Sequence, residues 1–139
     1  MSEQNKATVR RIYEEVFGQG KLDVADELLA PDAIDHEGEG GTGPQAVKDV
    51  VGMFRAAFPD LQVTIDDIMA DGDKVASRAR FMGTHKGEFQ GIPATGKRIE
   101  VEVIDIIRFG ADGKAVEHWG LTDNMLMMQQ LGVVPEMGS

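Results

Sequence analysis

KAVEHWGLTDNMLMMQQL, residues 114–131, is the stretch on which the organisation of the chain depends. Its first part, 114–121, predicts a final strand. Its second part, 124–131, predicts a short helix. Asp123 stands directly before that helix and is a favoured N-cap residue, because its carboxylate can accept a backbone N–H of the first turn.

The same stretch gathers a His, the only Trp and an Asp within six residues. Side chains alternate between the two faces of a strand, so Trp119, Leu121 and Asp123 share one face and His118 points to the other. A carboxyl beside a large apolar ring tends to have a raised pKa, which suits a general acid or base. Asp123 therefore has two interpretations, a helix cap and a pocket acid, and both can hold together.

Apolar periodicity in the N-terminal half predicts three helices. The first covers 5–17, the second covers 22–29, and the third begins at Pro44 and ends before Pro59. Between the second and third helices, 32–43 reads as a polar loop with a glycine cluster.

After Pro59 the apolar period changes from 3.6 toward 2, which indicates strands. Strands are predicted around 61–65, over 74–85 and over 98–109, with turns at Asp-Gly pairs. Helices followed by hairpin-linked strands indicate an α+β fold of three N-terminal helices and a mostly antiparallel sheet, which, if strongly curved, can wrap the first helix and leave a cavity between them.

The strand 98–109 carries apolar residues on both faces, with Val101 and Val103 on one and Ile104 and Ile106 on the other. Either both faces are buried or a bulge shifts the register. Glu102 and Asp105 fall on opposite faces of it, so one of them is expected to be partly buried.

The 139 residues suit a single domain, with a loose tail expected at 135–139. A formal charge of −10 argues against nucleic-acid binding, because phosphate contacts need clustered Lys and Arg. No apolar run approaches the length of a membrane span, and no signal peptide is recognisable, so we expect a cytoplasmic protein that does not associate with membranes. The absence of Cys excludes disulfides and thiolate chemistry.

Three segments resemble the SnoaL-like polyketide cyclase (ester cyclase) family: AFPDL at 57–61, GTHKGEFQGIPATGK at 83–97, and 112–132 with its EHW and QQLG. Their order and spacing match over nearly the whole chain. The resemblance implies the nuclear-transport-factor-2-like fold, a cone with a pocket in its mouth. It also implies homo-oligomers, most simply a homodimer, packed through the sheets.

The resemblance further implies ring closure of a polyketide by intramolecular aldol condensation, without metal or organic cofactor. An acidic residue near the end of the last strand serves as acid and base in such cyclases, and Asp123 lies in that region. A second alignment places that acid on Gly120, in which case the chain lacks the group. The superfamily also includes isomerases, dehydratases and plain binding proteins.

The candidate catalytic residues are Asp123, His85 and His118, since His titrates near neutral pH. For His85 the alternative is a neutral ring that bonds loop backbone, and for His118 it is a place in a subunit interface. The candidate substrate-binding residues are Tyr13, Phe17, His36, Phe54, Phe81, Glu102 and Trp119. Arg78 and Arg80 share a strand face, where they can pair with acids across strands or bind a ligand carboxylate.

The three histidines also allow a zinc or iron site, but no pair has a compact ligand spacing, so we predict no metal. Three functions remain open. The chain is a cofactor-free acid/base enzyme acting on a small, hydrophobic or polyketide-like carbonyl compound, a binding module for such a molecule, or a structural domain with a filled cone.

Overall fold

The computed structural model describes residues 2–37 and 41–134, so the predicted tail at 135–139 and part of the predicted glycine-bearing loop lie outside the described residues. The helices are α1 (Ser2–Arg11), the π-helical η1 (Ile12–Phe17), α2 (Leu22–Leu28), α3 (Gly43–Ala57) and α4 (Asn124–Leu131). The strands are β1 (Leu29–Asp35), β2 (Gly41–Thr42), β3 (Gln62–Asp71), β4 (Lys74–Thr84), β5 (Arg98–Phe109) and β6 (Ala115–Thr122). None of the helices in these described ranges is long and apolar enough to cross a membrane.

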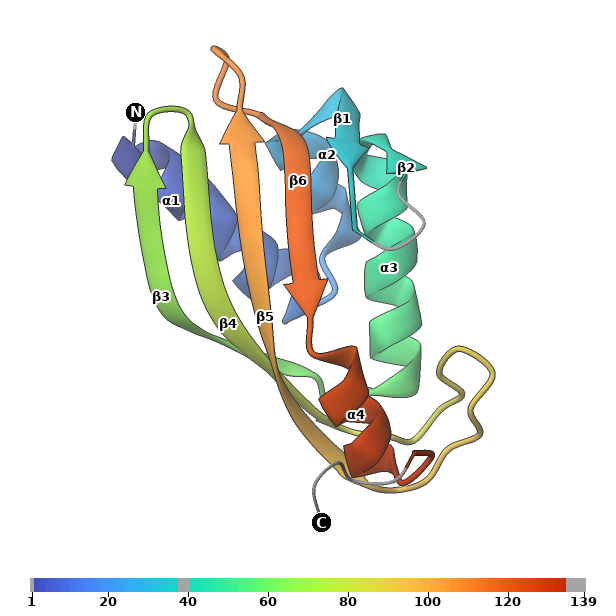
Figure 1. Ribbon diagram of the computed structural model, residues 1–139. Helices are drawn as coiled ribbons and strands as arrows, with labels where there is room; N and C mark the ends of the chain where they lie inside the picture. The colour runs from blue at the N-terminus through green and yellow to red at the C-terminus, as the bar shows by residue number, and fades with distance from the viewer. Residues whose placement is uncertain (1, 38–40, 135–139) are drawn as a thin grey trace.

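The strands form one sheet in the order β2-β1-β6-β5-β4-β3. From β3 to β6 each strand pairs antiparallel with the next, whereas β1 runs parallel to β6. The sheet bends strongly without closing, and α1, α2 and α3 cover its inner face, while α4 follows the end of β6 (Figure 1). The predicted α+β fold, with helices packed on a strongly curved and mostly antiparallel sheet, is confirmed, and the sheet stays open.

The inner face of the sheet and the helices enclose the core. Alternate residues of β5 are buried, including Val101, Val103 and Asp105, and they face the helices. Ile104 and Ile106 on the other face are 52% and 40% exposed. The register between β4 and β5 is unbroken, and that between β5 and β6 shifts only between Arg108 and Phe109. Neither alternative predicted for this strand holds, because its outer face is apolar and exposed.

The segment 32–43 is not a loop throughout, as the sequence predicted. The strand β1 begins at Leu29, runs through Pro31 to Asp35 and pairs with β6, and β2 adds a short outer strand. Local sequence gives little sign of β1, since it contains a proline and two acidic residues. Strand propensity depends strongly on neighbouring strands, and β6 supplies the partner here.

The first predicted helix changes winding near its centre. At Ile12 the α-helix passes into η1, and the N–H of Gly18 donates to the carbonyl of Tyr13, five residues back, at 2.9 Å. Short π-helical segments are frequent at functional sites, because they shift side chains away from the regular helical stripe. Tyr13 is buried in this segment and points toward the sheet.

Candidate functional site

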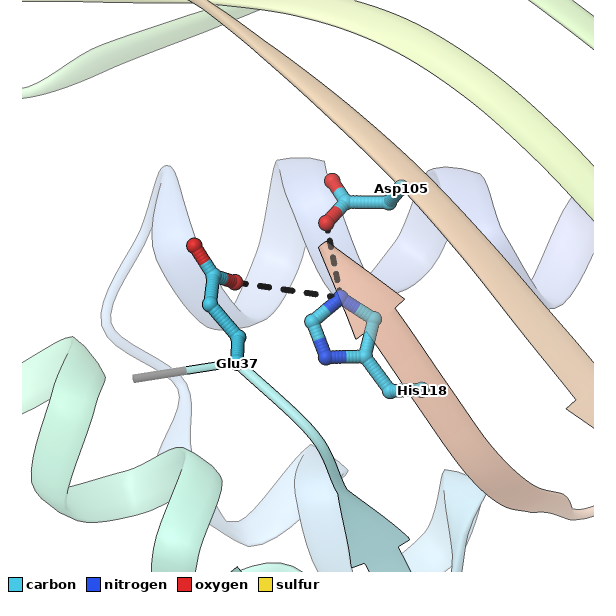
Figure 2. A group of neighbouring side chains, drawn as sticks. All are labelled: Glu37, Asp105 and His118. Carbon is cyan, nitrogen blue, oxygen red and sulfur yellow. Dashed lines mark hydrogen bonds and ion pairs between the residues drawn. The ribbon is translucent and has the colours of Figure 1, made fainter. Parts of the chain in front are cut away.

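A half-buried group of ionisable side chains lies on the inner face of the sheet, between the strands and the N-terminal helix. Asp105 comes from β5, His118 from β6, and Glu37 from the chain that follows β1 (Figure 2). Asp35, the last residue of β1, completes the group. We call these four residues the carboxylate–histidine cluster. Three elements far apart in sequence meet there because β1 and β5 flank β6 on its two sides.

Both ring nitrogens of His118 contact carboxylates. Nε2 lies 2.7 Å from Oδ1 of Asp105, and Nδ1 lies 3.0 Å from Oδ1 of Asp35. Because a carboxylate only accepts hydrogen bonds, this geometry requires protons on both nitrogens. His118 is therefore an imidazolium held between two carboxylates.

The pKa values agree with this geometry. Burial alone would lower the pKa of His118, but its hydrogen bonds to Asp105 and Asp35 and the charges of those groups outweigh that effect and raise it to about 10. Burial would likewise raise the pKa of Asp35, yet the hydrogen bonds from His118 and from the backbone of Glu37 keep it below its usual range. At neutral pH the ion pair is therefore fully charged.

Tyr13 ties the cluster to the core. Its hydroxyl donates to Oδ2 of Asp105 and lies 2.8 Å from Oγ of Ser77. Burial and the charge of Asp105 raise the pKa of Tyr13, so the phenol stays protonated and acts as a donor. Asp105 is thus fixed through both oxygens, one by His118 and the other by Tyr13.

Glu37 is the least constrained acid of the cluster. Its Oε2 accepts a hydrogen bond from the hydroxyl of Thr122 at 2.9 Å, and its Oε1 lies 4.0 Å from Nε2 of His118. The side chain is 35% exposed. Burial, followed by the negative charge of Asp105, raises the pKa of Glu37 despite the bond from Thr122. A carboxyl with a raised pKa and access to solvent is suited to exchange a proton with a bound substrate.

Gly120 faces the centre of the cluster. A Cβ at this position would lie 2.5 Å from Oδ1 of Asp105, 2.6 Å from Oε1 of Glu37 and 2.8 Å from Nε2 of His118. The functional atoms occupy the space that any side chain at 120 would need. Position 120 therefore faces the same space as the carboxylates of Asp105 on β5 and of Glu37 after β1.

The sequence and the fold have counterparts in known proteins. The model of SnoaL-like polyketide cyclases matches residues 7–131. The chain belongs to the SnoaL-like polyketide cyclase family. The resemblance found in its sequence is therefore confirmed.

Curated members of the family are named for ring closure of polyketide esters. The chain is 33% identical over 131 residues to the aklanonic acid methyl ester cyclase DauD of Streptomyces sp. strain C5, covering 89% of this chain and 79% of that one. It is 31% identical over 121 residues to the nogalonic acid methyl ester cyclase of Streptomyces nogalater, covering 84% and 89%.

Solved structures of the family share the fold. IdmH of Streptomyces antibioticus is 37% identical, with a TM-score of 0.78 and coverage of 93% of this chain and 99% of that one. TsrD of Streptomyces laurentii is 29% identical, with a TM-score of 0.83 and coverage of 93% and 98%.

Several residues predicted for the family site lie on the outer face of the sheet. Trp119 stacks on His36, with ring centroids 5.2 Å apart, away from the cluster. Glu102 pairs with Arg78 across the strands at 2.8 Å, as expected for one of the arginines. Asp123 is exposed and caps α4, accepting the N–H of Leu126 at 3.1 Å, which confirms the predicted cap. Its proposed catalytic role stays a prediction.

His85 lies at the opposite end of the sheet from the cluster. Asp105 pairs with Ser77, eight residues before His85, which is about 26 Å along an extended strand. The ring is fully buried against Phe58, and its Nδ1 accepts the N–H of Thr95 at 3.2 Å. The structure therefore places His85 as an anchor of the 86–97 loop, in agreement with the alternative weighed for it.

The predicted aromatic residues divide between core and site. Phe81 packs against Phe17 and Phe54, with ring centroids 5.3 Å and 5.7 Å apart, so these three belong to one aromatic cluster. Only Tyr13 reaches the carboxylate–histidine cluster. His36 is exposed, and its Nε2 contacts Glu117 at 2.7 Å.

Sequence reasoning missed Glu37 and Asp35 as site residues because it placed both in a loop. Alternation around His36 was the available signal, since its neighbours must face the opposite side in a strand. Of the two acids considered in β5, Asp105 is the buried one, as the pattern of that strand allowed.

Glu37, Asp105 and His118 place one ligand atom each within 4.8 Å of one another, a spacing that a metal ion could use. A metal ligand must be a neutral imidazole, however, and both nitrogens of His118 bind carboxylates instead. The three histidines do not converge.

Two hollows lie away from the carboxylate–histidine cluster. One of about 400 Å³ is lined by Arg10, Glu14 and 63–68. The other, of about 220 Å³, is lined by Glu102, Ile104, Leu121, Thr122 and Asp123.

Proposed function

We propose that this SnoaL-like protein is a cofactor-free acid/base enzyme that closes a ring in a small, largely apolar carbonyl compound by an aldol-type reaction. The observation that carries the proposal is the pairing of Glu37, whose pKa is raised and whose side chain reaches solvent, with the fixed imidazolium of His118. The names of the curated relatives support the reaction class, since both are cyclases of polyketide methyl esters.

In the proposed reaction, the carboxylate of Glu37 takes a proton from the carbon next to a carbonyl. The electrons of that C–H bond form an enolate, whose carbon attacks a second carbonyl and makes the new C–C bond. The resulting alkoxide then takes the proton from Glu37. Protons and electrons balance within the substrate and one carboxyl group, so the cycle needs no external reagent.

Both ring N–H groups of His118 are bonded to Asp35 and Asp105, so His118 acts on the negative charge that develops on the substrate oxygens through its positive charge and not by donating a hydrogen bond. Its charge is already in place before the reaction, because Asp35 and Asp105 orient it from both sides. Fixed charges in a half-buried site stabilise such intermediates more than water does, because they need not reorient. Tyr13 contributes by holding Asp105 in position.

The outer face of the sheet supports the expected homodimer. Ile104, Ile106 and Leu121 are exposed there, and Leu121 has 79% of its surface accessible. Exposed apolar side chains on one face commonly mark an interface. We propose that a second copy packs on this face, on the opposite side of the sheet from the carboxylate–histidine cluster.

The test is turnover of aklanonic acid methyl ester, measured by chromatography of the cyclised product. Glu37→Gln is expected to lower kcat by about 10²–10⁴-fold, the usual contribution of a general base. Asp123→Asn tests the acid predicted at the end of the last strand: if Glu37 is the base, this variant keeps activity. Loss of activity in Asp123→Asn alone would instead assign the reaction to the end of the last strand, and binding of the ester without turnover would favour the binding module.

A further inference from the structure

Asp35 ends β1 at a point where the chain must turn. In the parallel ladder Asp35 lies beside His118, and the N–H of His36 donates to the carbonyl of His118 at 2.9 Å. Asp35 points to the inner face and His36 to the outer face, where it stacks on Trp119. The backbone of β1 is therefore anchored to β6 on both sides of this turn.

A single oxygen of Asp35 makes two different bonds. Its Oδ1 accepts the N–H of Glu37 at 2.8 Å and also contacts Nδ1 of His118 at 3.0 Å. The first bond is an Asx turn, in which a side-chain oxygen replaces a backbone carbonyl and reverses the chain locally. It directs Glu37 back over β6, where Thr122 and His118 meet its carboxylate.

The second bond sets the orientation of the imidazolium. With Nδ1 held by Asp35, Nε2 points toward Asp105 and Glu37. The side chain of Asp35 is 18% exposed. It joins the two groups on which the proposed reaction depends.

We propose that Asp35 is a positioning residue that couples the Glu37 segment to the His118 imidazolium, so that the proton acceptor and the fixed positive charge keep one geometry. This inference rests on the proposed function for its catalytic consequence. The geometric part stands on the two hydrogen bonds alone. Asp35 itself does not contact the substrate in this arrangement.

Two substitutions separate the turn from the charge. Asp35→Asn retains an oxygen that can accept the N–H of Glu37, but it has no charge. Asp35→Ala removes both. The control is Asp32→Ala in the same strand, where the side chain is exposed.

The first readout is the titration of His118, monitored by nitrogen-15 NMR of its ring. Both Asp35 variants are expected to lower the His118 titration midpoint by about 1–3 pH units, the usual effect of one adjacent charge.

The second readout is steady-state turnover of aklanonic acid methyl ester. Asp35→Ala is expected to lower kcat about 100-fold with KM within about threefold, since small misplacements have such costs. The kcat of Asp35→Asn is expected to be about tenfold higher than that of Asp35→Ala, and its pH–rate profile is expected to be shifted from that of the natural protein.

An Asp35→Ala protein with an unchanged His118 titration would overturn the inference. An Asp35→Ala protein that loses kcat but keeps the pH–rate profile of the Asp32→Ala control would also overturn the inference, because a merely structural role predicts that result. Full activity in Glu37→Gln would refute the proposed function. The link between Asp35 and His118 could still be measured in that case, because the NMR readout needs no turnover.

Discussion

Replacing Gly120 by Ala is predicted to force the carboxylate–histidine cluster apart. The new Cβ would lie 2.5 Å from Oδ1 of Asp105 and 2.8 Å from Nε2 of His118. An ordinary carbon–oxygen contact is about 3.4 Å, so these groups must retreat by about 0.6–0.9 Å. Asp105 has little room to do so, because its other oxygen bonds Tyr13 inside the core.

The cost follows from the bond that is lost. The contact of 2.7 Å between His118 and Asp105 joins two charged groups, and such a bond contributes about 1.5–3 kcal/mol. Overpacking adds about 1–3 kcal/mol, while replacing Gly in a strand regains about 0.5–1 kcal/mol of chain entropy. We expect the free energy of unfolding to fall by about 1.5–5.5 kcal/mol, the combined range of these contributions.

Urea denaturation measures this loss, and ring NMR measures the accompanying fall in the His118 pKa from its raised value. Gly52→Ala is the control. Gly52 lies in α3, and its Cβ would meet no heavy atom within 4 Å, so this change should stabilise the protein by up to about 1 kcal/mol. A Gly120→Ala protein with unchanged stability and unchanged His118 titration would refute the argument from close packing.

Three further predictions concern the cluster and the outer face. The pKa of His118 is raised in the folded state, so its ion pairs stabilise the fold fully below about pH 6.5 and this contribution is lost as pH rises toward about 10. The stability advantage of the natural chain over His118→Gln should shrink over that range in urea titrations, and a constant advantage would contradict the charged pair. Tyr13→Phe should cost about 1.5–3 kcal/mol in the same assay, because Asp105 loses a buried donor, and a neutral result would show that the hydroxyl is dispensable. Leu121→Glu should convert a dimer to a monomer in sedimentation, since it places a charge on the exposed apolar face, and unchanged assembly would exclude this face as the interface.

Periodicity carried the main elements of the fold. The final strand and the helix capped by Asp123 appear where the alternation of 114–121 and the cap signal placed them. The antiparallel strands and the α+β class followed from the change of apolar period after Pro59. These features depend on local patterns, which a single sequence displays directly.

The position of β1 could not be read in the same way. Its residues include Pro31 and two acids, and they become a strand because β6 offers a parallel partner. The sequence alone determined that His118 and Trp119 point to opposite sides, but only the packing of the helices on the sheet placed His118 inside.

The sequence by itself thus determined the order of elements, the family and the set of ionisable residues available for chemistry. Tertiary structure decided which of them act together. Glu37, Asp105 and His118 come from three separate segments, and Gly120 leaves the space in which they meet. Such a contact depends on the relative position of strands in a sheet, and strand order is a long-range property that no local pattern encodes.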